Sequence, residues 1–198
     1  MKNNPKSLLI SILLMAIGCK NETQNDTPVA DGNNASAEIS VVAEPKSRPK
    51  SLNQITAAEA FELKPNEIYS KDSLPKNKEV YAVIVDWALN SNKTSIVAFK
   101  TGEASFLLNG IDMQFEKNPQ SFNSFSVSLI DKAEKVLSSF TPTTERTAPE
   151  QNQMKIYVLT GDGKYLYENK ITEFKNNKEI HDVFEAASRL LLESRKAL

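Results

Sequence analysis

The chain has 198 residues, of which 40 % are hydrophobic, and a formal net charge of −1. This length suits one domain, or one domain with a tail, and every Phe, Tyr and Trp lies at Phe61 or later, so the core-forming residues are confined to the last two thirds. Lysine and arginine are scattered among the acidic residues and form no basic stripe, so nucleic acid is not an expected partner.

The first residues have the layout of a secretory signal. Lys2 and Lys6 precede an apolar stretch at 7–17, and small or apolar residues lead to Cys19, the only cysteine. The apolar stretch is about 11 residues long, far short of the ~20 that span a bilayer. We therefore expect a signal peptide over residues 1–18, cleaved after Gly18.

The residues Ala16-Ile17-Gly18-Cys19 resemble the lipobox of bacterial lipoproteins, although that family more often has leucine at the position of Ala16. The resemblance implies diacylglycerol on the Cys19 thiol and a second acyl group, such as palmitate, on the new amino terminus. Several acyl chains give stable anchoring, whereas one binds a membrane reversibly. An ordinary cleaved signal or an uncleaved anchor is the alternative.

The residue after Cys19 bears on which membrane holds the anchor. Lys20 stands where an aspartate would resemble an inner-membrane retention signal, so we expect the outer membrane. The sequence leaves open whether the protein faces the periplasm or the cell surface.

Residues 19–53 are expected to form the lipidated cysteine and a disordered tether, because this stretch is polar and has no aromatic residue or sustained periodicity. A random coil of this length reaches roughly 30 Å. A single domain over 54–198 follows. Apolar residues at helical spacing predict a short helix over 52–63 that is capped by Ser51 or Thr56 and packs on a sheet.

The domain begins with strands. Alternating apolar or β-branched residues predict four strands in a meander, at 80–89, 94–99, 104–108 and 111–116. The first is apolar on both faces, which is typical of a central strand. Gly102 and the Asn109-Gly110 pair supply the positive φ angles that hairpin turns require.

The second half repeats the pattern of hairpin followed by helix. Its expected elements are a helix at 128–140 beginning at Ser128, a mobile connection at 141–153, strands at 154–159 and 165–171, and a final helix from Asn176. The fold class is therefore α+β, with a single antiparallel sheet (meander plus hairpin), two β-hairpin-plus-helix halves and helices packed on one face.

Four stretches resemble a family of small uncharacterised bacterial proteins, namely 80–86, 95–106, 109–111 and 156–163. The resemblance covers nearly all of 80–198 and implies the same α+β fold. The resemblance implies no activity for this chain. The chain also lacks the glycine-rich stretch that follows the Asn-Gly turn in that family.

Few residues are candidates for chemistry. Asp86 interrupts an otherwise apolar strand, so it lies either at a strand end near backbone donors or in a polar site. His181 is the only histidine and is expected on the helix surface, and no metal or cofactor motif is recognised. Asp72-Ser73-Leu74 resembles the O-glycosylation signal of some bacteria.

Tyr165 and Tyr167 share one face of the second hairpin, which either packs under a helix or forms a contact surface. We expect a non-enzymatic envelope lipoprotein that is bound to the membrane through Cys19 and that binds another envelope protein or component. The alternative is a carboxylate-dependent hydrolase or transferase that uses Asp86.

Overall fold

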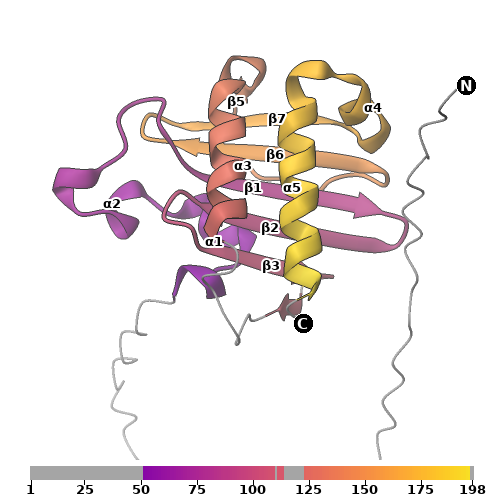
Figure 1. Cartoon of the computed structure of the whole chain (residues 1–198), viewed down its shortest axis with the longest axis horizontal. Coiled ribbons are helices and arrows are strands. Elements are labelled where there is room, and N and C mark those ends of the chain that lie inside the picture. The colour runs from indigo at the N-terminus through magenta and orange to yellow at the C-terminus, as the bar shows by residue number, and fades with distance from the viewer. Residues whose placement is uncertain (1–50, 110, 114–122, 197–198) are drawn as a thin grey trace, which may run out of the picture. The chain divides into compact units, whose positions relative to one another are not determined.

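A computed structural model describes residues 51–109, 111–113 and 123–196 of the chain. These residues form an α+β domain around a seven-stranded antiparallel sheet with the order β4-β3-β2-β1-β6-β7-β5 (Figure 1). The expected signal peptide, Cys19 and most of the expected tether lie outside the described residues.

The strands begin close to the predicted positions, except for β5, which falls in the stretch expected to be a mobile connection. They are β1 Val80–Leu89, β2 Asn92–Phe99, β3 Ala104–Leu108, β4 Ile111–Met113, β5 Thr141–Pro142, β6 Gln153–Thr160 and β7 Lys164–Lys170. β1 is central, between β2 and β6, as its apolar faces predicted. The turn residues Gly102 and Asn109 have φ angles of 104° and 52°, which confirms their assigned roles.

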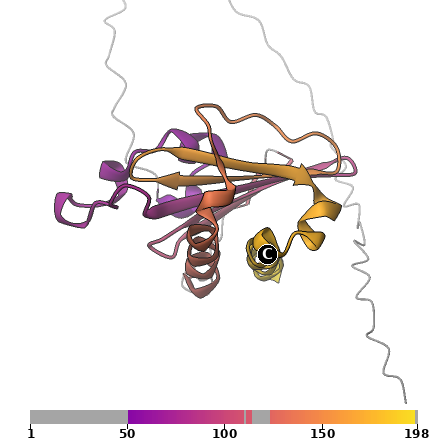
Figure 2. The ribbon, with the colours of Figure 1, turned by 90° about the horizontal axis from the view of Figure 1, so that it is seen from above.

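The longer helices cover one face of the sheet. The α-helices are α1 Ala57–Glu62, α2 Pro65–Ile68, α3 Asn123–Lys135, α4 Ile171–Asn176 and α5 Lys178–Lys196, with short 3-10 turns at Leu52–Gln54, Lys71–Ser73 and Leu137–Ser139. Figure 2 shows α3 and α5 on one side of the sheet and the segment 143–152 arching over the other. The predicted fold class is confirmed, and α1 adds a small helix on the opposite face.

Apolar residues fill both faces of the sheet. Under α3 and α5 the core includes Trp87, Leu129, Phe174, Ile180, Val183 and Leu190, all of them buried. Tyr167 packs here with its ring centroid 5.8 Å from that of Phe140 and 5.3 Å from that of Phe174. Of the two alternatives for the tyrosine face, packing under a helix thus holds for Tyr167, whereas Tyr165 is half-buried and also lines an open cavity described below.

The opposite face has its own, smaller core beneath α1. Phe61 meets Tyr157 edge to face, with ring centroids 5.5 Å apart, and Ile84, Val97 and Phe99 are buried beside them. Thr56 caps α1, because its side chain accepts a hydrogen bond from the Glu59 amide and the Glu59 carboxylate accepts one from the Thr56 amide.

Two predicted helix starts are wrong. α3 begins at Asn123 instead of Ser128, and the buried Ser126 hydroxyl inside its first turns accepts from the Phe99 amide at 3.1 Å and lies 2.9 Å from the Phe99 and Glu103 carbonyl oxygens. Tertiary hydrogen bonds thus hold the first turns of this helix against the end of β2 and the turn that follows it.

The last helix, α5, begins at Lys178 and is capped by Asn177, whose side-chain oxygen accepts from the Glu179 amide at 3.0 Å. The expected start at Asn176 is therefore wrong. The short helix α4, which ends at Asn176, was not predicted because it occupies the junction between two stronger patterns.

Candidate functional site

A row of polar side chains crosses the middle of the sheet on the face opposite α3 and α5. The register pairs Asp86 with Ser95 on β2 and with Lys155 on β6, and pairs Lys155 with Glu168 on β7. Paired residues on neighbouring strands point to the same face. Four adjacent strands therefore each contribute one polar residue to this row, which we call the polar row.

Asp86 is the most enclosed member of the polar row, with 1 % of its surface exposed. Arg146 donates to it in a bidentate pair, Nε to Oδ2 at 2.9 Å and Nη2 to Oδ1 at 2.8 Å, and the Ser95 hydroxyl donates to Oδ1 at 2.5 Å. Such a charge-assisted pair satisfies a buried carboxylate. Asp86 thus lies in a polar cluster within the strand, and the alternative of a strand end with backbone donors is wrong.

Arg146 belongs to the segment 143–152, which we call the strap. The Tyr157 hydroxyl donates to the Thr147 carbonyl oxygen and accepts from the Thr147 amide, both at 3.0 Å. Lys155 Nζ donates to the Thr147 hydroxyl at 2.7 Å and lies 2.9 Å from a Glu168 carboxylate oxygen. The strap was predicted to be a mobile connection, but these contacts fasten it over the polar row.

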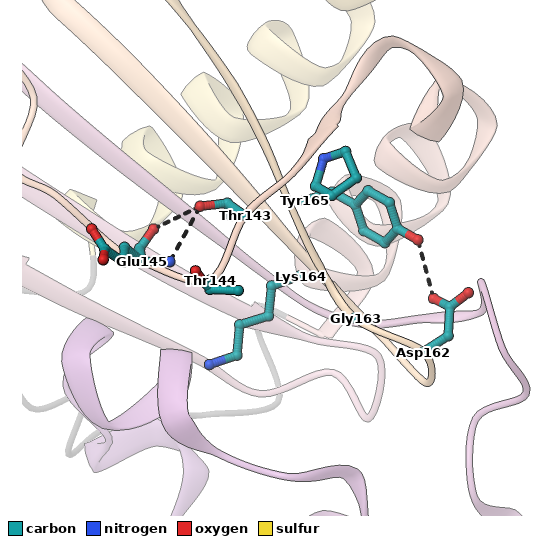
Figure 3. Close-up of a pocket in the computed structure, with 8 residues that line it drawn as sticks. Thr143, Thr144, Glu145, Asp162, Gly163, Lys164 and Tyr165 are labelled. Carbon is teal, nitrogen blue, oxygen red and sulfur yellow. Dashed lines mark hydrogen bonds between the residues drawn. The ribbon is translucent and has the colours of Figure 1, made fainter.

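The strap also forms one wall of two shallow, open cavities. One, of about 510 Å³, is lined by residues 142–145 and 162–165, and its side chains are drawn in Figure 3. The other, of about 430 Å³, lies between the strap and α1 and is lined by Ala58, Phe61, Glu62, Thr144, Glu145 and Arg146. The two cavities share Thr144 and Glu145, and we call them together the strap groove. Asp86 lines neither cavity.

Charged and hydroxyl groups line the strap groove. Lys164 points toward α1 in Figure 3, where its ammonium lies 3.4 Å from a Glu62 carboxylate oxygen and 3.9 Å from the centre of the Phe61 ring. Tyr165 points the other way and donates to Asp162 at 3.3 Å. Partial desolvation, followed by the neighbouring Asp162 charge, raises the pKa of Tyr165.

The other sequence candidates lie apart from the polar row. His181 is in the first turns of α5 with its side chain 40 % exposed, and its Nε2 lies 3.4 Å from a Glu185 carboxylate oxygen. Ser73 is exposed in a 3-10 turn, where its hydroxyl lies 2.9 Å from that of Ser70. Cys19 and Gly18 fall outside the described residues.

The partners of Asp86 show which functional residues the sequence did not reveal. Arg146 and Thr147 sit in a polar, proline-containing segment with no periodicity, and nothing local marks either of them. In contrast, Ser95 and Lys155 follow from the register once Asp86 is placed on a central strand.

Within the described ranges, no helix combines the length and apolar character needed to cross a bilayer. The same ranges hold no group of three or more His, Cys, Asp or Glu side chains arranged to bind a metal ion. Comparison of the chain with protein-family models, curated protein sequences and solved structures found no match.

Proposed function

We propose that this chain is a lipid-anchored protein of the bacterial envelope, and that its folded domain is a non-enzymatic binding module on a tether. The observation that carries the proposal is Cys19, which ends an Ala-Ile-Gly-Cys motif directly after a signal-like apolar stretch. Acylation at this residue would hold the protein at the membrane, and Lys20 favours the outer membrane. A tether of this length would let the domain reach partners roughly 30 Å away.

The strap groove is the proposed contact surface. The Thr144 hydroxyl and the carboxylates of Glu145 and Asp162 offer hydrogen-bonding partners along an open concave surface. The Thr143 hydroxyl also lines this surface but is already paired with the Glu145 backbone. Concave surfaces with a few convergent polar groups are common binding sites. The proposed partner is an envelope protein or another envelope component.

The contacts of Asp86 favour binding over the alternative of carboxylate catalysis. A general base must come within hydrogen-bonding distance of the proton it removes. Both oxygens of Asp86 already accept from Arg146, and its side chain is only 2 % exposed. A substrate would have to displace that pair before Asp86 could act on it.

The anchor is tested by replacing the acyl acceptor. Cys19→Ala should leave the protein unprocessed, or move it out of the detergent-soluble membrane fraction, and should abolish labelling with a palmitate analogue. Lys20→Ala is the matched control and should be processed and labelled like the parent. If Cys19→Ala is processed, labelled and fractionated like the parent, the lipoprotein proposal is wrong.

The contact surface is tested by photo-crosslinking in intact cells. A photoreactive amino acid at Thr144 or Ala58 should give a discrete crosslinked species, because both positions line the strap groove. The control position is Arg189 on α5, whose side chain is 71 % exposed on the other side of the sheet. Equal crosslinking at all three positions would refute the groove as the contact surface.

A further inference from the structure

The strap is attached differently at its ends and at its middle. Among the described residues, backbone-to-backbone hydrogen bonds join it to the sheet only near its ends, from the Thr143 amide to the Lys164 carbonyl at 2.9 Å and from the Asn152 amide to the Ala88 carbonyl at 2.7 Å. Its middle is held by the Arg146 side chain on Asp86 and by the Thr147 hydroxyl on Lys155. The Thr147 backbone also bonds with the Tyr157 hydroxyl, and Pro149 is buried, but none of these contacts belongs to the strand ladder. The middle can therefore leave the sheet without breaking the strand ladder.

The site that receives Arg146 belongs to the sheet and not to the strap. Asp86 and Ser95 are directly paired residues of β1 and β2, two of the most central strands, so their relative position is set by the ladder. Together they present a carboxylate and a hydroxyl toward one guanidinium. This site would persist if Arg146 left it.

Stability alone does not explain an ion pair at this position. A buried ion pair must offset the desolvation of both charges, and well-packed apolar residues of similar size often hold a structure at least as well. Beside the polar row the same face is mostly apolar around Ile84 and Phe99, with the buried Ser105 as an exception. A charged pair does, however, discriminate strongly between a guanidinium and other groups.

We propose that Asp86 and Ser95 form a guanidinium-binding site in which Arg146 is an internal, replaceable occupant, so that an arginine in an extended segment of a partner protein takes its place. This inference rests on the proposed binding function and names the chemistry of one partner. Displacement of Arg146 would release Thr144 and Glu145 from their present positions, because they directly precede it in the strap. Binding at the polar row would then reshape the strap groove.

The test uses the full-length protein in detergent and the peptide acetyl-Thr-Glu-Arg-Thr-Ala-Pro-Glu-amide, which repeats residues 144–150. Arg146→Ala empties the site, so this variant should bind the peptide at least about 10-fold more tightly than the parent, in which Arg146 competes. A peptide with citrulline for arginine keeps the shape but loses the charge, and should not bind measurably. The double variant Arg146→Ala with Asp86→Asn should also lose binding.

Binding of both peptides to Arg146→Ala, or of neither, would overturn the proposal. If this variant does not fold, hydrogen exchange in the parent protein decides. The Thr147 amide should exchange faster than core amides such as that of Val158, and excess arginine peptide should speed it further while the citrulline peptide does not. Exchange of Thr147 at the rate of the core, unchanged by peptide, would show that the site never opens. By contrast, failure of the photo-crosslinking experiment at Thr144 and Ala58 would count against the proposed function alone and leave the guanidinium site untouched.

Discussion

Gly161 provides a sharp test of how the β6–β7 turn packs. A Cβ atom added there would lie 2.5 Å from the Pro75 carbonyl oxygen and 2.9 Å from the Asn77 carbonyl oxygen. Both are backbone atoms, and the Asn77 oxygen also accepts from the Asp162 amide at 2.8 Å. The segment before β1 therefore cannot retreat without losing this hydrogen bond. Overpacking of this kind costs about 1 to 3 kcal/mol.

Gly163, two residues later, is the matched control. The nearest atom to its added Cβ is Tyr165 Cε2 at 3.9 Å, an ordinary contact, and neither glycine has a positive φ. Gly163→Ala should thus change stability little, or raise it by about 0.4 to 1 kcal/mol by restricting the unfolded chain.

Thermal unfolding followed by circular dichroism separates the two variants. For a chain of this size 1 kcal/mol shifts Tm by about 2 to 4 °C, so Gly161→Ala should lower Tm by about 2 to 12 °C while Gly163→Ala should not lower it. Equal Tm values for the two variants would refute the close approach between this turn and the segment that precedes β1.

Three further predictions concern stability. Asp86→Ala should lower the free energy of unfolding in urea by about 3 to 5 kcal/mol, because it leaves Arg146 without its partner. The double variant Asp86→Leu with Arg146→Met should recover most of that loss, and no recovery would contradict the ion-pair argument. Burial, reinforced by nearby Glu67, raises the pKa of Tyr81 to about 12 from 10.0. The contribution of this phenol to stability should therefore be complete below pH 10 and be lost between pH 10 and 12. Tyr81→Phe should reduce this loss of unfolding free energy when unfolding is measured across that pH range. A chain that starts at Ser51 should unfold with about the same midpoint as the full-length chain. A chain that ends at Glu179 should not fold by circular dichroism, since it loses the fully buried side chains of α5.

All of the strands except the two-residue β5 could be predicted, because their signals are local. β1 carries apolar residues on both faces. Gly102, which has no side chain, and Asn109, whose side chain tolerates positive φ, stand where their hairpin turns need a positive φ. The start of α3 could not be predicted, because Ser126 is a poor helix-interior residue by propensity and its hydroxyl is satisfied by Phe99 and Glu103, more than 20 positions away. Contacts of that range leave no periodic trace in a single sequence.

The candidate site was predictable in part. A carboxylate on an apolar central strand requires a partner, so Asp86 was identified as an anomaly, and the register of the hairpin then places Ser95 beside it. The chain has 24 Lys and Arg residues, however, and composition does not select among them.

The register alone would have selected the wrong cation. Lys155 is the direct cross-strand neighbour of Asp86, yet its ammonium binds Thr147 and Glu168, while Arg146, 60 positions from Asp86 in the sequence, binds the carboxylate. The difference follows from the geometry of the two groups, since a planar guanidinium satisfies both carboxylate oxygens at once and an ammonium does not. The identity of the partner is thus decided by where the strap crosses the sheet. That crossing is held in part by Tyr157, which binds the Thr147 backbone on the same face of the sheet. Asp86 could therefore be recognised from one strand, whereas its partner could be recognised only from the packed domain.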